Sequence, residues 1–239
     1  MATCLGDTMF PEVARATVRL LERLGVDVEV PDGGTCCGQP MINTGYFDEA
    51  EPLVRNYART FADFDAVVLP SGSCAGSVRH QHELVARRCA DDDLVAAVEH
   101  HAPRAHELSE FLVDVLEVTD VGASFPHTVA YHPTCHSLRM LGVGDRPRRL
   151  LEGVAGLRLV DLPQERECCG FGGTFALKNA DVSTAMGEDK AQHAIDSGAE
   201  VLVAGDSSCL MQIGGLLSRR GAPVRTMHLA EVLVSEEGA

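Results

Sequence analysis

The sequence predicts an α/β fold of two pseudo-symmetric half-domains, each a short, mostly parallel sheet flanked by helices in the Rossmann-like manner. Three observations lead to this prediction. The 239 residues are 45% hydrophobic and 23% charged, a balance typical of globular domains and not of disordered or fibrous chains. Apolar runs of strand length alternate with longer stretches of helical periodicity. A pattern of cysteines occurs twice, which indicates an internal duplication.

Eight of the nine cysteines define the duplication. The gaps between successive cysteines are 32, 1 and 37 residues in one set and 33, 1 and 40 in the other. Each adjacent pair is followed by glycine, and the sets are offset by about 132 residues. The first quartet comprises Cys4, Cys36, Cys37 and Cys74, and the second quartet comprises Cys135, Cys168, Cys169 and Cys209. We expect one half-domain over residues 1–120, including linking helices, and the other over 121–239.

The expected elements of the first half start with a helix. Residues 11–24 begin with proline, which suits the first turn of a helix, and place Val13 and Leu20 on the same side. The other expected elements of this half are a short strand at 26–30, a helix at 48–64 and a buried, wholly apolar strand at 66–69.

The second half repeats this order. Residues 91–120 are expected to link the two halves as helical structure, with Asp91, Asp92 and Asp93 at a helix start. The elements expected after them are strands at 127–132, near 157–162 and at 201–204, and a long helical stretch at 174–197.

The cysteines fall at useful places in such units. Cys74, Cys135 and Cys209 each follow the carboxyl end of an expected strand, where open α/β sheets form their binding crevices. Cys4 is preceded by only three residues, too few for an equivalent strand. Either the first half opens without that strand, or the protein's true start lies upstream.

Charge and cysteine content limit the function classes. With 35 acidic against 20 basic side chains, the formal net charge of −15 argues against nucleic acid or an anionic membrane as a partner. No apolar run approaches the ~20 residues of a membrane helix, and the first residues are unlike a signal peptide. We therefore expect a cytoplasmic protein without membrane insertion. In a reducing compartment, nine cysteines indicate metal or redox chemistry.

The quartets suit iron–sulfur clusters. Four thiolates are the usual ligands of a [4Fe–4S] cluster, so we expect one cluster in each half. Adjacent cysteines can face one cluster only where the backbone bends, and Gly38 and Gly170 permit that bend. Structural zinc sites use C-x-x-C pairs, which neither half contains, so zinc is the minor alternative and vicinal disulfides a weaker one. Cys89, outside both quartets, is expected to be a small buried side chain.

Three segments carry a resemblance to a known family. They are Thr35-Cys36-Cys37-Gly38-Gln39-Pro40, Tyr131-His132-Pro133-Thr134-Cys135-His136 and Cys168-Cys169-Gly170-Phe171-Gly172-Gly173-Thr174-Phe175. With them the whole chain resembles the CCG-domain family, which includes the B subunit of heterodisulfide reductase and iron–sulfur subunits of glycolate oxidase and anaerobic glycerol-3-phosphate dehydrogenase. It is most similar to the lactate-utilisation protein A group.

The resemblance implies an iron–sulfur electron-transfer subunit of a cytosolic L-lactate-oxidising complex. It also implies two further lactate-utilisation proteins as partners, one with ferredoxin-like clusters, and a small 2-hydroxy acid as the substrate of the complex. One alternative is a subunit of a related oxidoreductase, of the glycolate oxidase or heterodisulfide reductase type, with direct substrate chemistry at a cluster. Another is a zinc-stabilised scaffold or sensor.

The chain departs from the broader family pattern where the terminal C-x-x-C would begin, at Ser71 and Asp206. Five cysteines per motif hold a non-cubane cluster in the heterodisulfide reductase subunit, so the resemblance leaves a fifth ligand missing here. Ser71 is expected to be a turn residue, because a serine hydroxyl binds iron only when deprotonated. Asp206 is a candidate metal ligand, because carboxylates bind iron, and its alternative role is to cap the following helix.

Other side chains near the motifs are weaker candidates. His132 and His136 flank Cys135 and are expected to form hydrogen bonds around the site or to lie on the surface. Their alternative role is proton delivery or binding of a substrate carboxylate. Lys178 is expected to be solvated. Tyr46 and Asn43, close behind the first C-C-G, are candidate pocket residues.

Overall fold

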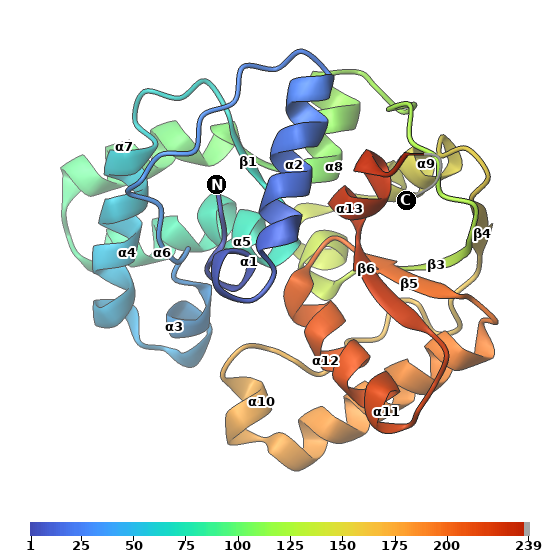
Figure 1. Ribbon diagram of the computed structural model, residues 1–239. Helices are drawn as coiled ribbons and strands as arrows, with labels where there is room; N and C mark the ends of the chain where they lie inside the picture. Colours follow the sequence, from blue (N-terminus) through green and yellow to red (C-terminus); the bar gives the residue numbers. More distant parts are fainter. Residues whose placement is uncertain (237–239) are drawn as a thin grey trace.

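The computed structural model describes residues 1–236 (Figure 1). We call the parts before and after the predicted division at residue 120 the first and second lobe. The first lobe, residues 1–120, contains α1 (Cys4–Thr8), α2 (Pro11–Arg23), α3 (Gln39–Thr44), α4 (Phe47–Thr60), β1 (Val67–Leu69), α5 (Gly72–Gly76), α6 (His82–Arg88), α7 (Asp92–His101), β2 (Ala105–Glu107) and α8 (Leu108–Glu110). The second lobe, from residue 121 on, contains β3 (Thr128–His132), α9 (Arg146–Glu152), β4 (Arg158–Val160), α10 (Phe175–Lys178), α11 (Ala180–Asp196), β5 (Val201–Ala204), α12 (Ser207–Arg219), β6 (Arg225–His228) and α13 (Leu229–Val234). Short π-helical turns lie at Ser77–Gln81, Phe111–Val115 and Ser137–Leu141, and a 3₁₀ turn at Ala102–Arg104.

Both sheets are parallel. In the first lobe β1 pairs with β2, with Val67 opposite Ala105. In the second lobe the strand order is β4-β3-β5-β6. Every residue of β3 and β5 is buried, which explains the continuous apolar sequence of β5. The predicted fold class, two parallel sheets flanked by helices, is therefore confirmed.

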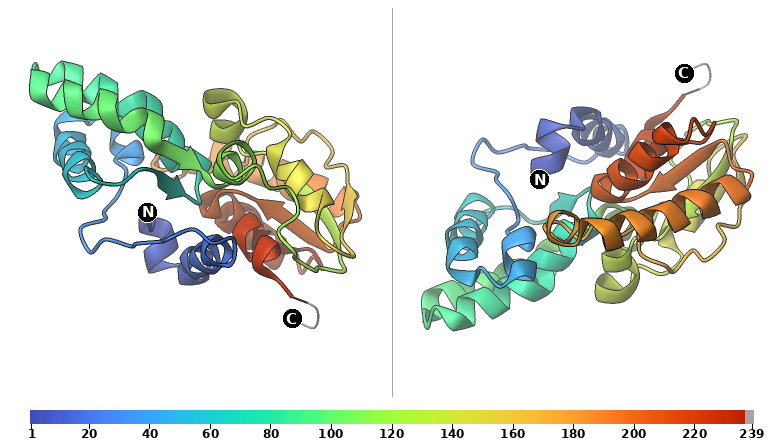
Figure 2. Two further views of the ribbon diagram at one scale, coloured as in Figure 1. Left: turned by 90° about the horizontal axis from the view of Figure 1, so that it is seen from above. Right: turned by 90° about the horizontal axis from the view of Figure 1, so that it is seen from below.

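The main core is shared by the two lobes. Helix α2 of the first lobe packs against α13 of the second, as the views from above and below show (Figure 2). The buried cluster around them includes Leu20 and Leu112 from the first lobe and Val129, Val201 and Leu229 from the second. The division at residue 120 follows the sequence repeat and stays a prediction, while the packing crosses it.

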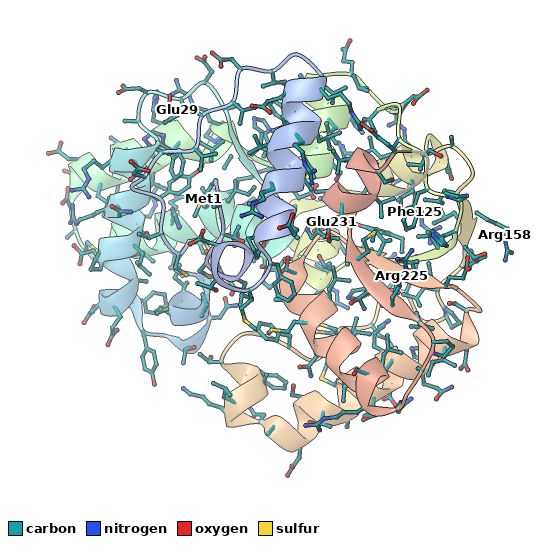
Figure 3. The ribbon with its side chains drawn as sticks, in the orientation of Figure 1. Met1, Glu29, Phe125, Arg158, Arg225 and Glu231 are labelled. Carbon is teal, nitrogen blue, oxygen red and sulfur yellow. The ribbon has the colours of Figure 1, made fainter. Side chains whose placement is uncertain are left out.

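The strand expected at residues 26–30 is wrong, because these residues form no ladder. In the second lobe the equivalent strand, β4, pairs with β3, and the repeat places the counterpart of β3 ahead of Cys4. Met1, labelled in Figure 3, lies inside the first lobe, and its amino group donates a hydrogen bond to the Val68 carbonyl of β1 at 2.7 Å. A cavity of about 760 Å³ is lined by both β1 and residues 26–30. Residues 26–30 therefore lie beside β1 across this cavity and do not pair with it.

The sequence analysis also missed strands β2 and β6. The stretch 91–120, expected to be a helical linker, forms α7 and then adds β2 to the first sheet. Its helix start is as expected, because the Asp91 carboxylate accepts a hydrogen bond from the Leu94 N–H at 3.0 Å. The helix expected at 174–197 is interrupted at Asn179, which separates α10 from α11.

The two missed strands extend the internal repeat. Each leads directly into a helix that starts with a capping box, formed by Glu107 and Glu110 after β2 and by His228 and Glu231 after β6. The same strand-to-helix junction therefore closes both halves of the duplication.

Candidate metal centre

The last cysteine of each quartet lies in the first turn of a helix. Cys74 is the third residue of α5, directly after β1, and Cys209 is the third residue of α12, directly after β5. The N-cap residues are Ser71 and Asp206, at equivalent positions of the repeat. At both places a helix N-terminus meets the carboxyl end of a parallel strand, the position at which open α/β sheets form their binding crevices.

The adjacent cysteines lie in two turns of the same geometry. Gly38 and Gly170 both have a φ angle of +84°, a conformation that glycine adopts without strain. In each turn the glycine N–H donates a hydrogen bond to the first cysteine, from Gly38 to Cys36 Sγ and from Gly170 to Cys168 Sγ, both at 3.4 Å. The bend predicted from C-C-G is confirmed in both lobes.

The first cysteine of each quartet also starts a helical segment. Cys4 is the first residue of α1, and Cys135 begins the helical turn after β3. The Cys135 and Cys168 sulfur atoms are 3.5 Å apart. All nine cysteines are free thiols; Cys37, Cys74, Cys169 and Cys209 are buried, whereas Cys4 is exposed and Cys36, Cys89, Cys135 and Cys168 are half-buried.

The eight cysteines of the two quartets line a single cavity of about 310 Å³. Both lobes contribute to its wall, with Gln39 from the first and Thr134, His136 and Phe171 from the second. Phe125, Arg158 and Arg225, labelled in Figure 3, mark the opposite, amino-terminal end of the second sheet. Sequence reasoning predicted one quartet in each half, but gave no sign that both quartets face the same cavity.

Hydrogen bonds among the thiols prepare one thiolate in each quartet. A hydrogen bond from Cys37 is the main cause that lowers the pKa of Cys36 to about 3. In the second quartet, a hydrogen bond from Cys135 is the main cause that lowers the pKa of Cys168 well below its usual range. The donating thiols of Cys37 and Cys135 have raised pKa values in consequence. A thiolate is the form of cysteine that binds metals.

Asp206 links the two lobes beside the cavity. Its Oδ1 accepts hydrogen bonds from the Ser208 N–H at 3.3 Å and hydroxyl at 2.7 Å. Its Oδ2 accepts from the Ser73 N–H at 2.9 Å and the Ser71 hydroxyl at 3.3 Å, both in the first lobe. These contacts support the helix-cap role, and the role of Asp206 as a metal ligand stays a prediction. Ser71 caps α5 by accepting from the Cys74 N–H at 3.3 Å, so its expected role as a turn residue is confirmed.

Two buried histidines lie near the quartets. His82 of α6, which sequence reasoning missed, pairs through Nε2 with the Cys37 carbonyl at 2.8 Å. His132, the last residue of β3, is 1% exposed, and neither ring nitrogen has a hydrogen-bond partner among residues 1–236. Burial lowers the pKa of both side chains to about 4, so both are neutral at neutral pH. The expectation that His132 forms a hydrogen bond or lies on the surface is wrong. His136 is half-buried, with Nε2 3.2 Å from Gln39 Nε2.

Lys190 is a buried cation that sequence reasoning missed. It lies in α11 with no exposed surface, and its Nζ donates a hydrogen bond to the Gln164 carbonyl at 2.5 Å. Burial lowers its pKa, while the Cys169 and Cys168 thiols act in the opposite direction. The buried Ala191 and Ala194 share its helix face, a pattern from which its burial was predictable.

The remaining candidates lie outside the cavity wall. Lys178 is exposed, as expected, and its Nζ is 3.3 Å from the Tyr46 hydroxyl. Neither Tyr46 nor Asn43 lines the cavity, and Asn43 instead accepts a hydrogen bond from Gln81 at 2.7 Å. Cys89 packs against a separate apolar cluster of the first lobe.

Comparison with known proteins agrees with this arrangement. The CCG family, described as a cysteine-rich domain, matches residues 1–79 and 129–214, a segment in each lobe. The chain belongs to the CCG cysteine-rich domain family. Its relatives in this family include lactate utilization protein A of Exiguobacterium sp., 48% identical over 235 residues that span 97% of this chain and 94% of the relative. The protein of the same name from Geobacillus kaustophilus is 48% identical over 231 residues, 97% of this chain and 95% of the relative. That from Oceanobacillus iheyensis is 43% identical over 231 residues, with 97% and 93% covered.

The donor set of this CCG protein fits an iron–sulfur cluster in each lobe. Each quartet supplies four sulfur atoms, a thiolate prepared by hydrogen bonds and a glycine N–H directed at a sulfur. The adjacent cysteines do not have the spacing of structural zinc sites. Within residues 1–236, no helix is both long and apolar enough to cross a membrane.

Proposed function

We propose that the chain is an iron–sulfur electron-transfer subunit of a lactate-oxidising system. The main observation that supports the proposal is that two complete cysteine quartets line one cavity. The names of its relatives, lactate utilization protein A, supply the substrate of the system. A [4Fe–4S] cluster in each quartet would supply one-electron transfer, and two such clusters match the two electrons released when a 2-hydroxy acid is oxidised.

The protein's own residues hold and insulate the clusters in this proposal. Cys37, Cys74, Cys169 and Cys209 anchor them from the buried side, and Cys4, Cys36, Cys135 and Cys168 bind from the open side. The partners are two further lactate-utilisation proteins, one with ferredoxin-like clusters. The net charge of −15 predicts docking to a basic surface, with an affinity that falls as the salt concentration rises.

A second candidate is direct substrate chemistry at a cluster. The cavity between the quartets favours it, because His136, Gln39 and Thr134 offer polar groups to a small molecule beside the sulfur atoms. In that case the spectrum of the clusters changes when the substrate binds to the isolated chain. An electron-transfer subunit, by contrast, responds to lactate only in the presence of its partners.

Anaerobic purification followed by metal analysis and electron paramagnetic resonance (EPR) tests the proposal. We expect about eight irons per chain with matching sulfide, and EPR signals on reduction. We also expect lactate to reduce the clusters only when the partner proteins are added. Stoichiometric zinc without sulfide would contradict the proposal and support the scaffold. A change of the EPR line shape on adding lactate or a disulfide to the isolated chain would support direct chemistry.

A further inference from the structure

His132 occupies an unusual place for a histidine. It ends β3, the central strand of its sheet, and pairs in register with Ala204, the last residue of β5. A buried imidazole normally satisfies its ring nitrogens with hydrogen bonds, because an unpaired buried polar group is destabilising. His82 in the first lobe follows this rule through the Cys37 carbonyl. Within the described chain His132 has no such partner on either ring nitrogen. Something else must therefore account for a polar ring at this position.

The nearest donor atoms are two cysteine sulfurs of the second quartet. A ring nitrogen of His132 and the sulfur atoms of Cys169 and Cys209 all lie within 4.8 Å of one another, and all three side chains are buried. No other group of three or more histidine, cysteine or carboxylate donors in residues 1–236 converges so closely. Cys169 comes from the C-C-G turn and Cys209 from the first turn of α12, so three separate segments meet at this point.

We propose that His132 is a metal ligand, and that its ring nitrogen binds the second-lobe metal centre beside the sulfur atoms of Cys169 and Cys209. The inference rests on the proposed metal centre in that lobe and adds a ligand to it. It supplies a fifth donor to the second quartet from the end of β3, separate from Asp206, whose oxygens are held by four hydrogen bonds.

The chemistry of the three donors is compatible with one metal. Iron and zinc both accept imidazole together with thiolate. A buried, neutral imidazole keeps the lone pair that a metal requires, and no competing hydrogen bond occupies it in the described chain. Because the three donors lie on the buried side of the quartet, they leave Cys135 and Cys168 to bind from the open side.

The first lobe lacks this ligand. The repeat places Met1 at the position of His132, and His82 is held by a backbone carbonyl. We therefore expect a histidine ligand in the second-lobe centre alone. Because the second-lobe centre would carry a neutral imidazole that the first-lobe centre lacks, we also expect the two centres to differ in reduction potential.

Protein labelled with ¹⁵N only in histidine tests the inference without any substitution. In the reduced, iron-loaded chain, we expect pulsed EPR to detect a histidine nitrogen coupled as strongly as a coordinated imidazole. The coupling is lost in His132→Ala and retained in the matched control His136→Gln, which directly follows Cys135 in the sequence and lines the cavity wall. His132→Cys keeps the centre, removes the nitrogen coupling and lowers the potential, which a merely structural role for His132 would not do.

The outcomes separate this inference from the proposed function. An iron- and sulfide-loaded chain with no strongly coupled histidine nitrogen would overturn the ligand role and leave electron transfer standing. Should the chain hold no iron, the proposed function fails, and Co²⁺ is added as the probe instead. Absorption bands of mixed nitrogen and sulfur coordination that His132→Ala abolishes then support the ligand role. Cobalt bands that are the same in His132→Ala contradict it.

Discussion

The first lobe carries its cysteines on a two-stranded sheet and the second on a four-stranded sheet, yet the backbone around the two quartets is the same. In both lobes a glycine at φ +84° donates to a cysteine sulfur at 3.4 Å, and the last cysteine is the third residue of a helix. The two halves of the duplication therefore share the backbone geometry that positions the cysteine sulfur atoms, while the number of strands in their sheets differs.

The buried side chains near the two quartets differ more than the backbone around the quartets does. The second quartet has His132 and the buried cation Lys190 behind it, and the repeat gives Met1 at the position of His132 in the first lobe. The first quartet has His82 instead, held by a backbone carbonyl. Since charge and hydrogen bonds around sulfur set cluster potentials, the comparison teaches that two similar ligand sets can differ in redox behaviour.

The largest expected effect concerns the independence of the two quartets. If each lobe holds its own cluster, as we propose, replacing Cys36 and Cys37 by serine removes half of the bound iron, and so does replacing Cys168 and Cys169. Iron analysis after anaerobic purification measures this, with Cys89→Ser as a control that keeps all the iron. If either pair removed all of it, the shared cavity would hold one joint centre.

The two C-C-G turns differ in how much space surrounds the glycine. A Cβ at residue 170 would lie 2.5 Å from the Ser183 carbonyl oxygen, whereas a Cβ at residue 38 would meet no atom closer than 3.6 Å. We expect both alanine variants to have a free energy of unfolding that is about 1–2 kcal/mol lower, because alanine disfavours positive φ. For Gly170→Ala we expect the free energy of unfolding to fall by roughly 1–3 kcal/mol more, because the added Cβ displaces the backbone at Ser183.

Thermal unfolding of the two variants, compared with the unchanged protein, measures this difference between the turns. Gly45→Ala is a suitable control, because this glycine also has positive φ, at 86°, with no atom within 4 Å of the added Cβ. Equal losses for Gly38→Ala and Gly170→Ala would mean that the segment around Ser183 moves freely.

The parts of the fold that the sequence predicted are those that depend on local pattern. Strands β1 and β5 follow from short, continuous apolar runs, and α2 from its proline start and apolar side. Strands β2 and β6 read Ala-His-Glu and Arg-Thr-Met-His, so neither an apolar run nor alternation marks them. They are strands because β1 and β5 offer a neighbouring edge, whereas residues 26–30 form no ladder with any strand of residues 1–236. Pairing partners far along the chain decide these cases.

The site follows the same division. Cysteine spacing and the glycine after each pair sufficed to predict both quartets and both turns. The shared cavity could not be predicted from the sequence, because it depends on how the lobes pack through α2 and α13. Lys190 was missed although its helix face was readable, because a lysine among small residues is ordinarily solvated.

Lys190 gives a smaller test of the asymmetry. Replacing it with methionine removes a buried positive charge near the second quartet, so the potential of the second-lobe centre falls by tens of millivolts. A redox titration followed by EPR measures the shift, and the first-lobe centre serves as the internal reference. Lys178→Met is the matched control, because solvent screens an exposed lysine. Equal shifts in both centres would contradict a local charge effect.

The smallest expected effect separates the two strand-to-helix junctions by pH. Burial raises the pKa of Glu107 to about 7 and lowers the pKa of its counterpart His228 to about 4. The stability that Glu107 contributes is complete below about pH 4.5 and is lost as the pH rises through 7. The contribution of His228 is complete above about pH 6.5 and is lost as the pH falls through 4. The two equivalent caps therefore favour opposite ends of the same pH range.

Glutamine variants of the two caps reveal these opposite slopes. Glu107→Gln keeps an oxygen that can accept the Ser109 N–H, now bonded at 2.8 Å, but removes the ionisation. The midpoint temperature of Glu107→Gln therefore rises relative to that of the unchanged protein as the pH rises from about 4.5 to 7. The rise is about 2–4 °C for each kcal/mol of relative stability that the variant gains. The midpoint temperature of His228→Gln rises relative to that of the unchanged protein in the other direction, as the pH falls from about 6.5 to 4. The reason is that the variant has no buried imidazole that becomes protonated in acid. Parallel midpoint curves for the two variants would show that the junctions do not titrate as their burial implies.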